Sequence, residues 1–86
     1  MTTRYTYQHL VELVDGDHEL IVHLVEEGII ERRGDDTAVV DVDRVLVART
    51  LWRELELDWG AIEIILRLRD ELAEARARLA QLIDVT

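Results

Sequence analysis

The sequence contains no cysteine, no proline, no phenylalanine and no lysine, and each absence excludes something. Without cysteine there is no disulfide, no thiol nucleophile and no thiolate metal site. Without proline no helix of this chain carries an encoded kink. No apolar run approaches the roughly 18 residues of a membrane-spanning helix, and no basic-then-apolar leader is evident. We therefore expect a cytoplasmic protein that does not enter membranes.

The charged residues are unevenly distributed along the 86-residue chain, which is long enough for one domain with a thin core. The chain has nineteen acidic residues and ten basic ones, all arginine, which gives a net charge of -9. Residues 1–43 hold eleven acidic and three basic residues, whereas residues 44–86 hold eight and seven. Such a chain is repelled by nucleic acid and by anionic membranes, so the composition favours a basic protein surface as partner.

The first part of the sequence predicts two short helices. Thr6 can cap a helix that ends near Val14, an Asp-Gly pair then breaks it, and Asp17 can cap a second helix over residues 18–27. A glycine follows as the C-terminal stop. The second helix is expected to bury Leu20, Ile21, Leu24 and Val25. Two short helices joined by a tight glycine-containing turn indicate a helix-turn-helix.

A β-hairpin and two further helices are expected next. Two β-prone runs, residues 29–32 and 37–40, flank the polar turn 33–36, which after a helix-turn-helix predicts a wing. A third helix over roughly residues 42–56 is apolar over a broad arc, with Asp41 or Asp43 as its cap.

The last helix, from about residue 59 to residue 82, can be capped by Asp58 and carries a heptad pattern. Its apolar residues repeat at spacings of three and four, which predicts a dimer interface formed by Ile65, Leu68, Leu72, Ala75, Leu79 and Leu82. Since three heptads is short for a coiled coil, the front of the helix is expected to pack on the domain and the rear to project into a partner helix.

These elements predict a mainly α fold with a small hairpin wing and a long C-terminal coiled-coil helix. Residues 1–58 are expected to form a winged helix-turn-helix domain, and residues 59–86 a dimerisation helix within the same structural unit. The order of elements resembles that of the MerR-like DNA-binding domain followed by its dimerisation helix.

A more specific resemblance lies at the junction of the third and last helices. Residues 53–62, RELELDWGAI, leading into residues 66–72, LRLRDEL, resemble the segment of the CbpM chaperone-modulator family in which an LDW tripeptide opens the long helix. The chain departs from that pattern at Gly60, where the family tends to have proline; both residues suit a helix start. In layout the resemblance covers nearly the whole chain, and in residue identity mainly residues 53–72.

This resemblance implies a function. CbpM-like proteins bind the J-domain of a CbpA-type, DnaJ-like co-chaperone, block its delivery to the chaperone DnaK, and so inhibit its action. They are not enzymes and need no cofactor. The resemblance thus implies a homodimeric chaperone modulator with a J-domain partner. The alternative function is a MerR-like DNA-binding transcription regulator.

The second helix and its leading turn bear on this choice because they offer five carboxylates and no basic side chain. A DNA-reading helix depends on phosphate contacts, which this surface opposes. The basic helix face that the resemblance implies for a J-domain would complement an acidic stripe. The predicted partner-binding residues, with Val22 and His23 on the outward side, are Asp15, Asp17, Glu19, Val22, His23, Glu26 and Glu27. The alternative is that the acids only keep a small domain in solution.

Other residues have simpler interpretations. His18 and His23 are five residues apart, too far to share a helix face, so no metal site is predicted and a solvated Glu19–His23 pair is the simpler interpretation. Trp52 and Trp59 are expected in the core, with Trp59 sealing the junction to the last helix.

The only close carboxylate pairs are Asp35-Asp36 and Asp41-x-Asp43, which a turn and a helix cap explain. No nucleophile-and-base pair and no phosphate-binding loop accompanies them, so no catalytic activity is predicted.

Overall fold

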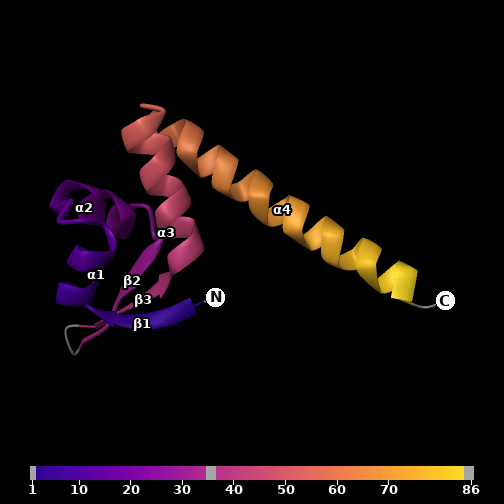
Figure 1. Cartoon of the computed structure of the whole chain (residues 1–86), viewed down its shortest axis with the longest axis horizontal. Helices are drawn as coiled ribbons and strands as arrows, with labels where there is room; N and C mark the ends of the chain where they lie inside the picture. The colour runs from indigo at the N-terminus through magenta and orange to yellow at the C-terminus, as the bar shows by residue number, and fades with distance from the viewer. Residues whose placement is uncertain (1, 35–36, 85–86) are drawn as a thin grey trace.

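The computed structural model describes residues 2–34 and 37–84 and shows a mostly helical chain with one small sheet (Figure 1). In chain order the elements are β1 (Thr2–Thr6), α1 (Tyr7–Leu13), α2 (His18–Glu26), β2 (Ile30–Arg32), β3 (Thr37–Asp41), α3 (Val42–Arg49), the π-helical segment η1 (Thr50–Glu54) and α4 (Trp59–Asp84). The two predicted hairpin strands are confirmed as β2 and β3. Their turn was expected over residues 33–36, of which 35 and 36 lie outside the described residues.

The sheet has three strands rather than the expected two. Both β1 and β2 pair antiparallel with β3, so the order is β1-β3-β2. Strand β1 was not predicted because it lies at an edge and reads Thr-Thr-Arg-Tyr-Thr, with no apolar alternation to mark a buried face. Its β-branched and aromatic residues are nevertheless typical of strands.

Helix starts follow the predicted caps. Side-chain oxygens accept backbone N–H bonds at Thr6 (from His9, 3.2 Å), Asp17 (from Leu20, 3.1 Å), Asp41 (from Arg44, 3.4 Å) and Asp58 (from Ala61, 2.8 Å). Asp41 rather than Asp43 therefore caps α3. Both breaks around α2 use the left-handed region, with φ of 80° at Gly16 and 75° at Gly28, which glycine adopts without steric cost.

The third helix is not one regular α-helix over residues 42–56. It is α-helical to Arg49 and then widens into η1, where the amide of Leu55 donates to the carbonyl of Thr50 at 3.1 Å. An insertion of this kind changes the angular spacing of the side chains that follow it. Trp52 and Arg53 of η1 both contact residues of α2 or its cap.

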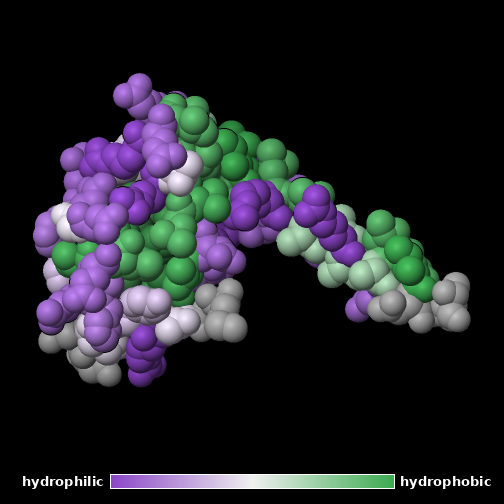
Figure 2. All heavy atoms as spheres, viewed as in Figure 1, coloured by the Kyte–Doolittle hydropathy of each residue, from purple (hydrophilic) through white to green (hydrophobic). Residues whose placement is uncertain are grey.

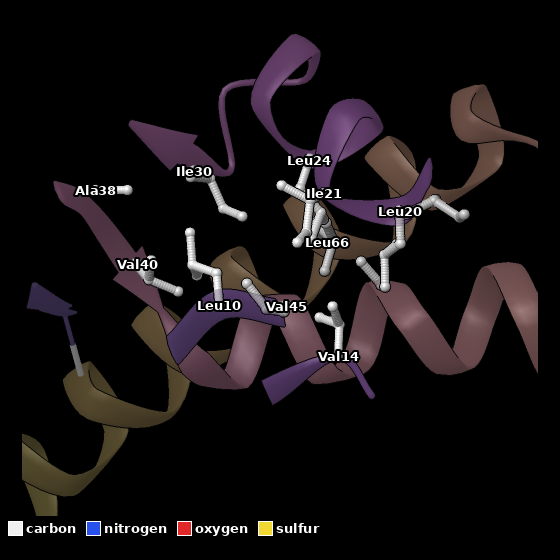
Figure 3. Close-up of a cluster of buried hydrophobic side chains, with 12 residues drawn as sticks. Leu10, Val14, Leu20, Ile21, Leu24, Ile30, Ala38, Val40, Val45 and Leu66 are labelled. Carbon is white, nitrogen blue, oxygen red and sulfur yellow. The ribbon is translucent and has the colours of Figure 1, made fainter. Parts of the chain in front are cut away.

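A single apolar cluster joins the helices to the inner face of the sheet (Figure 3). Every element except β1 and η1 contributes at least one fully buried residue: Leu10, Val14, Leu20, Ile21, Leu24, Ile30, Ala38, Val40, Val45, Ala48, Ile62 and Leu66. Burying each of the larger side chains contributes roughly 1.5–3 kcal/mol. This core fixes α2 against the hairpin.

Helix α4 belongs to the globular part only at its start. Ile62 and Leu66 are buried, and Arg44 of α3 forms an ion pair with Asp70, whereas α4 beyond that point projects away (Figure 1). The expected division between a packed front and a projecting rear is confirmed. No helix in residues 2–34 and 37–84 is both long and apolar enough to cross a bilayer.

Candidate partner-binding site

The candidate site is built around α2, whose start is held by contacts from η1. Besides capping the helix, Asp17 accepts two hydrogen bonds from the guanidinium of Arg53, at 2.7 and 2.9 Å. Two parallel bonds between a guanidinium and a carboxylate are strong and orientation-specific. The same Arg53 lies 3.6 Å from Glu19 and stacks 3.8 Å above the Trp52 ring.

Arg53 lowers the pKa of Asp17. The hydrogen bond from Arg53 is the largest cause; burial of the carboxyl opposes it, and the bond from the Leu20 amide adds to it. The Asp17 side chain is only 19% exposed, so this ion pair is better shielded from solvent than the others of the site.

Arginines of α3 and η1 pair with several carboxylates of the predicted acidic stripe, and this finding corrects the prediction. Arg49 pairs with Asp15 at 2.7 Å, and Arg53 engages Asp17 and Glu19, so the carboxylates at the start of α2 are largely neutralised by α3 and η1. Sequence analysis missed this because the partners lie more than thirty positions apart, and no local spacing encodes such a pair. The remaining acidic surface is at the other end of α2, at Glu26 and Glu27.

His23 was predicted to face outward, and this is wrong. Its ring stacks on Trp59 at a centroid distance of 5.1 Å and meets Trp52 edge-on at 4.8 Å. The reason is that η1 and the start of α4 cover the flank of α2 where residue 23 lies, which a helical wheel of α2 alone does not reveal. The predicted Glu19–His23 pair is absent from the described residues; His23 instead lies 4.0 Å from Glu26.

The two tryptophans are half-buried and lie 5.2 Å apart, packed against the core at the junction with α4. The prediction that Trp59 seals this junction is confirmed. Its indole nitrogen is buried and has no hydrogen-bond partner among the residues described. Leaving a buried donor unsatisfied costs about 1–3 kcal/mol.

Val22 does face outward, as predicted, and is 54% exposed. It stands between Glu19, three residues before it, and Glu26, four residues after it, on the side of α2 opposite the core. Val22, Glu26 and Glu27 are thus the predicted partner-binding residues that remain on an open face.

A groove of about 860 Å³ runs alongside this face. We call it the α2–hairpin groove; it is lined by Tyr7 of α1, Ile21, Val22 and Val25 of α2, and Ile30 and Ala38 of the hairpin. Its lining also includes Glu26 of α2, Arg32 of β2 and Arg33, which follows β2. Sequence analysis did not foresee the groove, because three separate elements form it.

Each of the three histidines contacts an aromatic side chain, and the histidines do not contact one another. His9 meets Tyr5 edge-on at 6.4 Å, and His18 bonds through Nδ1 to the Tyr7 hydroxyl at 2.9 Å. In the part of the chain that the structure describes, no three metal-binding side chains come together.

The predicted dimer seam is largely open to solvent. Ile65 is half-buried at the domain edge, and the other five positions, Leu68, Leu72, Ala75, Leu79 and Leu82, are exposed. Figure 2 shows hydrophobic surface where α4 leaves the globular part and again toward its far end. This solvent-exposed row of leucines at heptad spacing has no partner among residues 2–34 and 37–84.

Comparison with known proteins found no matching family model, no matching curated protein and no matching solved structure. The interpretation therefore depends on the residues and their geometry.

Proposed function

We propose that this chain is a homodimeric chaperone modulator that binds the J-domain of a CbpA/DnaJ-like co-chaperone and inhibits its action with DnaK. In this proposal α1, the glycine turn and α2 form a MerR-like helix-turn-helix, and β2–β3 is its wing. The resemblance of residues 53–72 to the CbpM family supports it. Those residues form the end of η1, the capped corner and the first half of α4. The chain has no catalytic role and no cofactor in this proposal.

The observation that carries the proposal is the outward face of α2. It presents Val22 beside Glu26 and Glu27, and α2 itself contains no arginine or lysine. Arg49 and Arg53, which approach the start of α2, are engaged by carboxylates. An apolar centre with an acidic rim suits a basic protein surface, where charge complementarity speeds association and sets specificity.

The alternative, a DNA-binding regulator, is favoured by one observation. Arg32 ends β2 and Arg33 follows it, where a winged domain would contact phosphate. Two arginines next to a carboxylate-bearing helix supply few phosphate contacts, and these contacts dominate DNA affinity.

Dimerisation in this proposal uses α4. The 26 residues from Trp59 to Asp84 span about 39 Å, long enough for the exposed leucines of two copies to pair. A dimer would present two α2 faces, and so two partner sites.

The test is the ATP turnover of DnaK stimulated by a J-protein. The wild-type protein is expected to suppress it, and the double change Glu26→Lys, Glu27→Lys to relieve that suppression by about tenfold or more in the concentration required. The matched control is Glu63→Lys with Glu74→Lys, which changes the charge equally at exposed positions of α4 outside the predicted dimer seam.

The control is expected to suppress like the wild type. Wild-type protein that leaves ATP turnover unchanged, yet binds duplex DNA firmly at ordinary salt, would show that the alternative function is correct.

A further inference from the structure

The α2–hairpin groove has an arginine on its inner side with no evident role in the fold. Arg32 is directly opposite Ala38 in the β2–β3 register, and Ile30 is opposite Val40. Residues directly opposite one another in antiparallel strands project to the same face. Since Ile30, Ala38 and Val40 are buried against the helices, the Arg32 side chain stands on that same face, beyond the end of the apolar core.

Arg32 is exposed and forms no ion pair or hydrogen bond with any residue of 2–34 and 37–84. Its neighbour Arg33 lies 3.6 Å from Glu31. A guanidinium presents donors in a rigid fork that matches a carboxylate, and at Arg32 this fork stands beside the apolar side chains that line the groove.

The lining of the groove carries charges of both signs. Arg32 and Arg33 come from the hairpin and Glu26 from α2, together with the apolar side chains of Tyr7, Val22 and Val25. Tyr7 and Val22 are 53% and 54% exposed, so the apolar floor continues to the surface. A ligand that fills the groove must offer an apolar side chain to the floor and a negative group to Arg32.

We propose that the α2–hairpin groove binds a peptide segment of the protein partner in which an aspartate or glutamate, paired with Arg32, lies beside a large apolar side chain. This deepens the proposed function, because it gives the partner a second, acidic contact in addition to the basic surface that meets Glu26 and Glu27. The inference rests on the proposed function in one respect only, which is that the segment bound in the groove belongs to a protein partner.

The test uses a phage library of short random peptides selected on the immobilised full-length protein, with no J-protein present. The peptides recovered are expected to combine an acidic residue with a large apolar one. Arg32→Glu is expected to lower their affinity by about 10- to 100-fold, as for loss of hydrogen bonds to a charged group. Replacing the peptide's acidic residue by lysine is expected to restore binding to Arg32→Glu.

The matched control is Arg4→Glu, the same charge reversal at an exposed position of β1. Arg4 is paired with Val39, so it projects from the opposite face of the sheet. It is expected to change peptide affinity by less than about twofold, which is the size of a screened long-range charge effect. Circular dichroism confirms that both variants fold.

A library that yields no binder, binders without an acidic residue, or an equal loss in Arg4→Glu overturns the inference. Because no J-protein enters this experiment, its outcome is independent of the ATP-turnover test. Suppression of turnover that Arg32→Glu leaves unchanged, together with acid-free binders, would retain the proposed function and reject the groove.

Discussion

The globular part and the projecting half of α4 use the same apolar residues with opposite results. In the globular part, Leu20 and Leu24 of α2 are fully buried. In the projecting half, Leu72 and Leu79 have the same helical periodicity but are 50% and 57% exposed. A periodic apolar face predicts that something will cover it, and whether the same chain supplies the cover depends on how the helix is connected. Here only the first turns of α4 reach the core.

Making the same substitution in both regions is the most direct test of this difference. Leu24→Ala is expected to lower the free energy of unfolding by about 2–5 kcal/mol, because it leaves a cavity in the core. Leu82→Ala, at a side chain 71% exposed, is expected to change monomer stability by less than about 0.5 kcal/mol. Urea unfolding at low protein concentration measures both.

Equal losses in these two variants would mean that α4 is covered by its own chain. That result would contradict the division of the molecule into a closed globular part and an open helix.

At higher protein concentration, a substitution in the predicted dimer interface tests whether the exposed leucines of α4 are covered by a second copy. If the exposed leucines pair between two copies, Leu79→Ala is expected to raise the dimer dissociation constant by about tenfold or more, since each buried leucine contributes roughly 1.5–3 kcal/mol. Gln81→Ala, at an exposed α4 position off the seam, is the control. Sedimentation equilibrium gives the dissociation constants, and a wild-type chain that stays monomeric throughout would contradict the predicted interface.

The smallest expected effect is that of pH on stability, and it arises from the Asp17–Arg53 pair of the globular part. Because the folded-state pKa of Asp17 is lowered, the Asp17–Arg53 pair stabilises the fold above the unfolded-state pKa near 3.8 and stops doing so as pH falls through the lower folded value. Asp17→Asn keeps a good cap but loses the charge. It is therefore expected to lose less stability than the wild type when urea unfolding is compared at about pH 5 and about pH 3.

Asp43→Asn, at an exposed position early in α3, is the control for removing one carboxylate. If Asp17→Asn and the wild type lose the same stability on acidification, the contact with Arg53 does not lower the pKa of Asp17.

Local chemistry explains what could be predicted from the sequence. The caps at Thr6, Asp17 and Asp58 and the stop at Gly28 depend on residues three or four positions away, and all four predictions are confirmed. The hairpin strands and the projecting end of α4 follow from periodicity alone.

What the sequence could not show depends on contacts between distant segments. The engagement of Asp15 by Arg49, the packing of His23 on Trp59 and the edge strand β1 all require knowing which elements become neighbours. For this reason three of the five carboxylates of the predicted acidic stripe are engaged by arginines, whereas the outward position of Val22 was predicted correctly.

The aromatic junction at the base of α4 has a practical consequence. The chain has two tryptophans, and both lie beside His23, at the meeting point of α2 and α4. Tryptophan fluorescence therefore originates from one place, the junction of α2, η1 and the start of α4. The two tryptophans can therefore report, without labelling, whether binding at α2 changes the environment at the start of α4.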